Sequence, residues 1–363
     1  MIALFRKRFP TGLLLALAAL VLTGCVTTSY PPEGALGDPA LARALEKRLY
    51  DHVEMLAGEI GERHCYRPES YERAAAYIET ELSKLGYTVN RQAVHVPDNE
   101  KFACGETVAW NIEAVKPGTT RAEEVIVLGA HYDSKVATPK WNDSGPPLPD
   151  QAGTPGASDN ASGVAGVIEV ARALAETPLE RTIRFVAFAN EEPPFYQTDS
   201  MGSVVYARAL AADSSLEVVG MISLEQLGCF SKTPGKKRWP FLGITGLTDD
   251  TDYIAFLTNL SSRRLAKSCA RVFAEDSTVK VKVMPVPAFA KFVAWSDDWS
   301  FWKEGIPAFS VCDTAYLRND HYHELTDTPD SLDYEPMAEV VRSCVTMVAD
   351  LANAEPARSW CSD

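Results

Sequence analysis

The spacing of apolar positions along the chain changes repeatedly between two patterns, which predicts alternating helices and strands. Two early segments carry apolar residues every three or four positions, as amphipathic helices do. Later runs are short and almost wholly apolar, which is typical of strands covered on both faces. The expected helices are Leu41–Leu56, Tyr71–Leu85, Gly163–Ala175, Met201–Ala212, Thr251–Phe273, Trp299–Glu304 and Glu335–Asn353, and the expected strands are Val108–Val115, Val125–Gly129, Ile183–Ala189, Val218–Leu224 and Ile306–Val311.

This alternation predicts an α/β fold with a mostly parallel central sheet and helices on both faces, that is, an α/β/α sandwich. We find no internal repeat, so we expect one domain over residues 40–363. The stretch Ser134–Ala157 is rich in proline and glycine and has no apolar period. A loop of that length is often functional.

Composition supports a globular protein and excludes one class of partner. The 363 residues are 46% hydrophobic and 23% charged, so the chain can bury a large core. The 35 basic and 49 acidic side chains give a net charge of −14. Such a charge opposes binding to a nucleic-acid backbone or another polyanion.

The first 25 residues predict export. Three basic residues, Arg6 to Arg8, precede the apolar run Leu13–Leu22, which is too short to span a bilayer. The next residues, Leu22-Thr23-Gly24-Cys25, resemble a bacterial lipobox. We therefore expect a lipoprotein signal peptide at 1–24, an acylated Cys25 and a flexible tether at 25–39. An ordinary signal peptide or an uncleaved anchor helix is the alternative.

The expected location is the bacterial cell envelope, at the periplasmic side of the outer membrane. Disulfides persist in such a compartment, and the chain has eight cysteines. Cys65 and Cys104 are the favoured pair, and Cys344 with Cys361 is a weaker one. No cysteine pair has the spacing of a structural zinc site, so we expect no cysteine-ligated metal.

Ionisable residues follow three of the expected strands at the point where each strand ends. His131 and Asp133 follow the second strand, Glu191 and Glu192 follow the third, and Glu225 follows the fourth. Ligands of open parallel sheets bind beyond the carboxyl ends of the strands. One such residue alone would be interpreted as a solvated loop residue, but three strand ends together indicate a site.

Two further segments add metal-binding side chains. Asp159 precedes an expected helix, where by itself it would be an N-cap, and His321 and His323 lie near the C-terminus. Nitrogen and carboxylate ligands in this combination suit zinc. The set is large enough for two ions that share a bridging carboxylate and lie about 3.5–4 Å apart.

Five ordered motifs resemble those of the co-catalytic zinc peptidase family that includes aminopeptidase Y, bacterial leucyl aminopeptidases and glutamate carboxypeptidase. They are His131-Tyr132-Asp133-Ser134, the segment Gly156–Gly163 (GASDNASG), Asn190-Glu191-Glu192, Ser223-Leu224-Glu225 and the segment Tyr322–Thr328 (YHELTDT). The resemblance covers roughly residues 40–353. It implies a zinc exopeptidase, most simply an aminopeptidase that acts on the N-terminus of a peptide or protein.

The resemblance also implies a role for each residue. His131, Asp159, Glu192, Glu225 and His323 would hold two zinc ions, with Asp159 as the bridge. Glu191 would be the general base for a metal-activated water, and Asp133 the carboxylate that orients His131. His323 is preferred over His321 because the family's Asp-Thr step stands four residues after it. Glu225 is a departure, since aspartate is commonest there.

Two alternative functions remain at this point. Glutaminyl cyclase shares the fold and the His-Tyr-Asp-Ser-Lys run but uses one zinc ion. A non-catalytic binding protein on a degenerate peptidase fold is the other, although every expected catalytic position is occupied. Substrate preference, oligomeric state and the roles of Asp297 and Asp298 stay open.

Two smaller features also have alternative interpretations. An aromatic cluster would line a side-chain pocket or simply pack in the core: Phe289, Phe292, Trp295, Trp299, Phe301 and Trp302. Met201-Gly202-Ser203 resembles the family pattern or simply starts a helix.

Overall fold

The computed structural model describes residues 27–29, 38–139, 145–230, 252–285, 296–314 and 319–355. The expected signal peptide, the expected acylation site Cys25 and the cysteine at position 361 lie outside these residues. Among the helices of the described ranges, none has the length and apolar character needed to cross a membrane.

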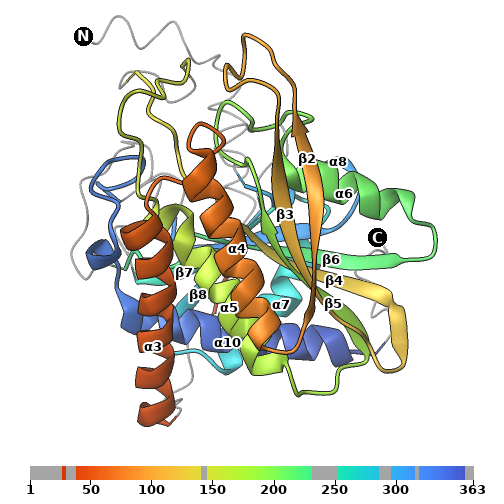
Figure 1. Cartoon of the computed structure of the whole chain (residues 1–363). Coiled ribbons are helices and arrows are strands. Elements are labelled where there is room, and N and C mark those ends of the chain that lie inside the picture. Colours follow the sequence, from red (N-terminus) through yellow and green to blue (C-terminus); the bar gives the residue numbers. More distant parts are fainter. Residues whose placement is uncertain are drawn as a thin grey trace, which may run out of the picture.

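Nine strands of the described residues form one sheet in the order β1-β8-β7-β9-β6-β4-β5-β3-β2 (Figure 1). Their bounds are Thr27–Ser29 (β1), Thr88–Val96 (β2), Thr107–Lys116 (β3), Arg121–His131 (β4), Arg181–Phe188 (β5), Glu217–Glu225 (β6), Tyr253–Thr258 (β7), Lys280–Pro285 (β8) and Ala308–Cys312 (β9). The four neighbouring strands β5, β4, β6 and β9 run parallel. Strands β3 and β7 are antiparallel to this central group.

Helices cover both faces of the sheet, as the sequence predicts (Figure 1). They are α3 (Pro39–Val53), α4 (Pro68–Lys84), α5 (Ser162–Leu174), α6 (Gly202–Ala212), α7 (Arg263–Glu275), α8 (Asp298–Lys303) and α10 (Tyr334–Asn353), with π-helical turns η1 (Glu54–Ile60) and η2 (Ala157–Ala161) and a 3-10 turn η4 (Pro329–Ser331). The expected α/β class with a mostly parallel central sheet is therefore confirmed.

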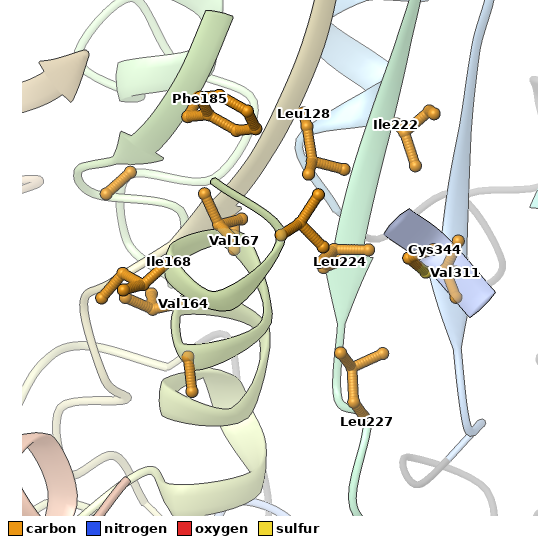
Figure 2. Packing of buried hydrophobic residues seen from close by; sticks show 14 of the residues in the cluster. Leu128, Val164, Val167, Ile168, Phe185, Ile222, Leu224, Leu227, Val311 and Cys344 are labelled. Carbon is orange, nitrogen blue, oxygen red and sulfur yellow. The ribbon is translucent and has the colours of Figure 1, made fainter. Parts of the chain in front are cut away.

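Alternate residues of β4 face two different cores because side chains of a strand point to opposite faces. Ile126 and Leu128 join the larger core, which is built with α3, α4, α5, α7 and α10. Figure 2 shows Leu128 of β4 with Val164 and Val167 of α5 among the side chains of this core. Val125 and Val127 join a second core, to which α6 and α8 contribute. The sheet is thus buried on both sides.

The structure differs from the expected elements in three places. The helix expected at Thr251–Phe273 is wrong in its first half, where Tyr253–Thr258 forms strand β7 before α7 begins. The run YIAFLT is continuously apolar, and such a run does not distinguish a buried strand from a buried helix by period. Strands β2 and β8 were not expected. Within the expected tether, Thr27–Ser29 pairs with β8.

Candidate metal centre

The register of the central strands brings three predicted site segments to one edge of the sheet. His131, the last residue of β4, lies opposite Phe188, the last residue of β5, and Glu225 is the last residue of β6. Glu191 and Glu192 follow β5 directly. Adjacent parallel strands that end together place these side chains at neighbouring positions.

The turn that carries Asp159 is fixed to the end of β6 by the next side chain. Asn160 donates from Nδ2 to the Leu224 carbonyl at 2.9 Å, and its Oδ1 accepts from the amides of Gly163 and Gln226. Gly163 permits this close approach, since a Cβ there would lie 2.2 Å from the Leu224 oxygen. These hydrogen bonds hold the turn that carries Asp159 against the end of β6.

His131, Asp159 and Glu225 form the first group of possible metal ligands, and all three are buried. Nε2 of His131 lies 3.2 Å from Asp159 Oδ1 and 3.4 Å from Glu225 Oε2. The longer glutamate arm thus reaches the position that the family resemblance implies. Ser296 and Asn160 also donate to Glu225 Oε2, at 2.8 and 3.1 Å.

Asp159, Glu192 and His323 form the second group. Nε2 of His323 lies 3.3 Å from Asp159 Oδ2 and 3.3 Å from Glu192 Oε1. Asp159 therefore presents one oxygen to each group, as a bridging carboxylate must. His321 points elsewhere, with Nδ1 2.8 Å from Thr326 Oγ1.

Two carboxylates outside the ligand groups hold the backbone of the site. Asp133 accepts from the amides of Glu191 and Glu192, both at 3.0 Å. The expected contact of Asp133 with the His131 ring also exists, but Nδ1 is nearer to the Asp133 carbonyl oxygen, at 3.2 Å, than to its carboxylate, at 3.4 Å. Asp327 binds the turn at residues 158–159 in the same way, at 2.8 and 3.2 Å.

Backbone conformation at the site is unusual in three places. Asn190, Gln226 and His323 have φ values of 57°, 56° and 58°. Each of these residues either is, or lies next to, a predicted ligand or base. Left-handed backbone costs a residue with a side chain on the order of 1 kcal/mol, and such conformations gather at functional sites.

The site buries many carboxylates close together. Eight carboxylates there are at most 6% exposed: Asp133, Asp159, Glu191, Glu192, Glu225, Asp297, Asp298 and Asp327. Nε2 of His131 and Oε1 of Glu192 make no hydrogen bond within the described residues. Ionised carboxylates in excess of the cationic groups that face them are costly to bury, so bound metal ions would stabilise this arrangement. The imidazole and carboxylate donors fit zinc.

The shifted pKa values at the site include those of His131 and Glu191. Burial would lower the pKa of His131, but the nearby carboxylates of Glu225 and Glu191 outweigh it and raise that pKa well above its ordinary value. Burial, with further help from Glu192 and Glu225, raises the pKa of the Glu191 carboxyl. Glu191 lies 3.8 Å from His131 Nε2 and belongs to neither ligand group.

The sequence motifs did not identify three residues that support the site. Asp327 lay inside a quoted motif but received no role. Ser296 and Arg63 lay in no motif. The buried Arg63 guanidinium donates to five backbone carbonyls, including those of Tyr132, Pro155 and Gly156, and so joins the segments on either side of the site.

The aromatic residues expected to line a pocket or pack in the core do not all have the same surroundings. Phe301 is fully buried among Phe188 and Tyr206, so core packing is the correct interpretation for it. Trp299 lies 6.4 Å from the ring of Tyr196, whose pKa is raised by burial and by nearby Glu191. Positions 289, 292 and 295 lie outside the described residues.

The expected bridge between Cys65 and Cys104 is not formed, and both are free thiols. They are nevertheless in contact, because the Cys65 thiol hydrogen-bonds to Cys104. Cys344 is also a free thiol in the buried core.

Comparison with known proteins agrees with this geometry. Residues 111–348 match the profile of peptidase family M28. The chain is 36% identical over 225 residues to the uncharacterized protein YfbL of Escherichia coli K12, a match that covers 62% of this chain and 66% of YfbL, just under two thirds. A probable leucine aminopeptidase of Arthroderma otae is 25% identical over 339 residues, covering 91% of this chain and 79% of that protein.

A solved structure shares the fold. BSAP, a zinc aminopeptidase from Bacillus subtilis, is 16% identical and superposes with a TM-score of 0.61, covering 86% of this chain and 96% of BSAP. The profile match spans more than half of the 363 residues and includes every predicted site residue. The chain therefore belongs to peptidase family M28.

Proposed function

We propose that this protein is a zinc-dependent aminopeptidase that holds two zinc ions and removes N-terminal residues from peptides. The observation that carries the proposal is the pair of ligand groups that share Asp159. His131 and Glu225 would complete the first zinc site, and Glu192 and His323 the second. Bound zinc would polarise the scissile carbonyl and lower the pKa of an attacking water to about 7.

Glu191 is placed to move the proton in this reaction. Its carboxylate takes a proton from the water that attacks the scissile carbonyl carbon, and then delivers it to the leaving amine nitrogen. Burial raises the pKa of Glu191, which suits a group that must both accept and release a proton near neutral pH. Asp133 fixes the backbone amide of Glu191 and so orients this base.

The charge of the site favours a substrate N-terminus. Asp297 and Asp298 are buried near the ligand groups, and neither belongs to them. Burial raises the pKa of Asp297 to about 8 and that of Asp298 to about 7. A positive group bound beside them would lower these pKa values and favour the ionised carboxylates. A substrate that brings a positive α-ammonium group would be attracted there, whereas a C-terminal carboxylate would be repelled.

Glutaminyl cyclase remains the second candidate function, because a solved glutaminyl cyclase from Bacteroides thetaiotaomicron shares the fold with a TM-score of 0.59. It would use one zinc ion and form a different product. A non-catalytic binding protein is disfavoured because the general-base position and both ligand groups are filled. The experiment is zinc stoichiometry of the purified protein, followed by a substrate panel. About two zinc ions with release of N-terminal amino acids supports the proposal. One zinc ion with cyclisation of N-terminal glutamine, or cleavage only at the C-terminus, would refute it.

We also propose that the protein is a lipoprotein of the bacterial envelope, acylated at Cys25. The support is the basic, apolar and lipobox-like order of residues 6–25. Mass spectrometry of the mature N-terminus from envelope fractions tests this. A diacylglyceryl-modified cysteine at position 25 is expected, and an unmodified N-terminus at any other residue would contradict it.

A further inference from the structure

The amino-terminal end of α7 carries a basic patch on an acidic protein. We define this patch as Arg263, Arg264 and Lys267, of which the first and third are exposed. None of the three forms an ion pair with an acid of the described residues, whereas Arg271, farther along the helix, pairs with Glu275. A cluster of free positive charge is unusual on a chain of net charge −14.

The position of the patch at the start of α7 is unfavourable for the stability of this helix. The first turn of α7 contains two arginines and no acid. The positive end of a helix dipole lies there, so arginines at this end are unfavourable for the helix. Residues that break a local rule without a structural gain are candidates for a functional role.

The topology places the patch at the edge of the sheet opposite the metal centre. Strand β7 is antiparallel to β9, and its last residue, Thr258, pairs with Phe309 near the start of β9. Since β9 runs parallel to β6, the end of β7 lies at the amino edge of the central strands. Helix α7 begins five residues later, so its first turn lies at this edge. The metal centre lies at the carboxyl edge.

Strand β1 starts at the same edge and beside the same helix. Thr27 pairs with Val283, close to the end of β8, and β8 is parallel to β7. The first residue of β1 is therefore directed to the amino edge, and α7 lies next to β1. In the sequence, Cys25 precedes the first residue of β1 by two positions.

We propose that the α7 patch binds anionic phospholipid headgroups of the membrane in which the acylated Cys25 is anchored. The inference rests on the proposed acylation, and it adds how the protein would be oriented relative to the membrane. The start of β1, which follows Cys25 in the sequence, and the patch lie at one corner of the molecule, so this corner would face the bilayer. The metal centre, on the opposite edge of the sheet, would face away from the membrane.

Acidic residues elsewhere along the amino edge of the sheet would limit the membrane contact to the corner that carries the α7 patch. Glu123 and Glu217 are exposed at the starts of β4 and β6, where an anionic surface would repel them. A polybasic segment next to a lipid anchor is a recognised way to add a second membrane signal, and each basic residue strengthens the attraction about fivefold. The net charge thus disfavours polyanions in general, but a local patch overcomes it.

Hydrogen exchange on the full, acylated and zinc-loaded protein tests the orientation. The protein is bound to vesicles of phosphatidylcholine alone, or of phosphatidylcholine with about one third phosphatidylglycerol. We expect backbone amides of residues 259–270 to exchange several-fold more slowly on the anionic vesicles. The difference should disappear in 1 M salt, where the screening length falls to about 3 Å.

A triple variant, Arg263→Gln with Arg264→Gln and Lys267→Gln, should lose this slowing while it still floats with neutral vesicles and still cleaves a soluble peptide. Failure of the wild-type protein to float with neutral vesicles would refute the acyl anchor, and the inference with it. Normal flotation with equal exchange of α7 on both vesicles would overturn the patch alone. Protection at residues 191–201 instead would reverse the orientation.

The matched control removes three exposed positive charges from the other end of the sheet: Arg73→Gln, Lys84→Gln and Lys101→Gln. Two of these lie on α4, which packs against β2 and β3. The control variant should keep the slowing of α7. An equal loss in the control would show that only net charge matters, and would overturn the proposal.

Discussion

Asp133 and Asp327 bind the two halves of the metal centre in the same manner, because each carboxylate accepts hydrogen bonds from two consecutive backbone amides. Asp133 holds residues 191–192, and Asp327 holds residues 158–159. Neither carboxylate belongs to a ligand group. The ligands therefore depend on a second set of acids that fix the chain from which they project.

We expect Asp327→Asn to weaken zinc binding about 10–100-fold, because one amide would face an NH₂ group in place of an oxygen and Asp159 would lose its fixed position. Both ions should be affected, since Asp159 is shared. Competition with a zinc-binding dye measures the affinity. Asp330→Asn, an exposed position three residues away, is the control and should bind zinc normally. Unchanged affinity in Asp327→Asn would contradict this prediction.

Glu191→Gln should retain both zinc ions and lose kcat by several orders of magnitude, because the amide cannot carry the proton. Glu192→Gln is the comparison, and it should lose metal instead. Zinc content and single-substrate kinetics of both variants provide the measurement. If Glu191→Gln turns over normally, the roles of general base and metal ligand have been assigned to the wrong glutamates.

Asp159→Asn should weaken the binding of both ions, whereas Glu225→Gln should weaken only one. The reason is that Asp159 belongs to both ligand groups and Glu225 belongs to one. Zinc per chain, measured by mass spectrometry after dialysis against a mild chelator, distinguishes the two outcomes. Loss of a single ion from Asp159→Asn would argue against a bridge.

Glu169 predicts a pH dependence of stability away from the metal centre. Burial raises its pKa, but hydrogen bonds from His52, Arg48 and Arg172 outweigh this and lower the pKa from 4.5 to about 2. A lowered pKa stabilises the fold above the unfolded pKa and loses that effect as the pH falls. The shift corresponds to about 3 kcal/mol at pH 7 and roughly half of that at pH 3.

Glu169→Gln should therefore be less stable than the wild-type protein at pH 7, and the difference should shrink at pH 3. Urea unfolding at the two pH values measures it. Glu176→Gln, an exposed neighbour, should show no such dependence. A difference that stays constant or grows towards pH 3 would show that the ionised carboxylate is not the stabilising form.

Cys65 and Cys104 should form a disulfide when treated with oxidised glutathione, which takes up the two thiol hydrogens. Their hydrogen bond lowers the pKa of Cys104, and a thiolate is the attacking species. A bridge between these positions should stabilise the protein by about 4 kcal/mol. Peptide mapping identifies the bond and calorimetry measures the rise in Tm. The deeply buried Cys269 should stay reduced, and a bridge to it would refute the pairing.

The sequence was sufficient to predict the α/β/α sandwich and the segments of the site, because the ionisable residues of the site follow the ends of the strands. His131, Glu192 and Glu225 each stand at or just after the end of an apolar strand. Glu191 and Glu192 could be separated only through the family resemblance, since periodicity does not say which side chain of a pair turns inward.

Other features depend on contacts between distant segments, which a local pattern does not contain. Arg63 lies about seventy residues from the Tyr132 carbonyl that it binds, so no motif could reveal it. Asp327 contacts a turn 168 residues away. The prediction of a helix at Tyr253–Thr258 was wrong for another reason. A short apolar segment fits a buried strand and a buried helix equally well.

Asp159 contacts two side chains that are far apart in sequence, His131 and His323. An incompletely folded chain cannot assemble this cage, because its corners come from five separate stretches of polypeptide. Metal binding would therefore follow folding, and a chain that is not yet folded would lack peptidase activity.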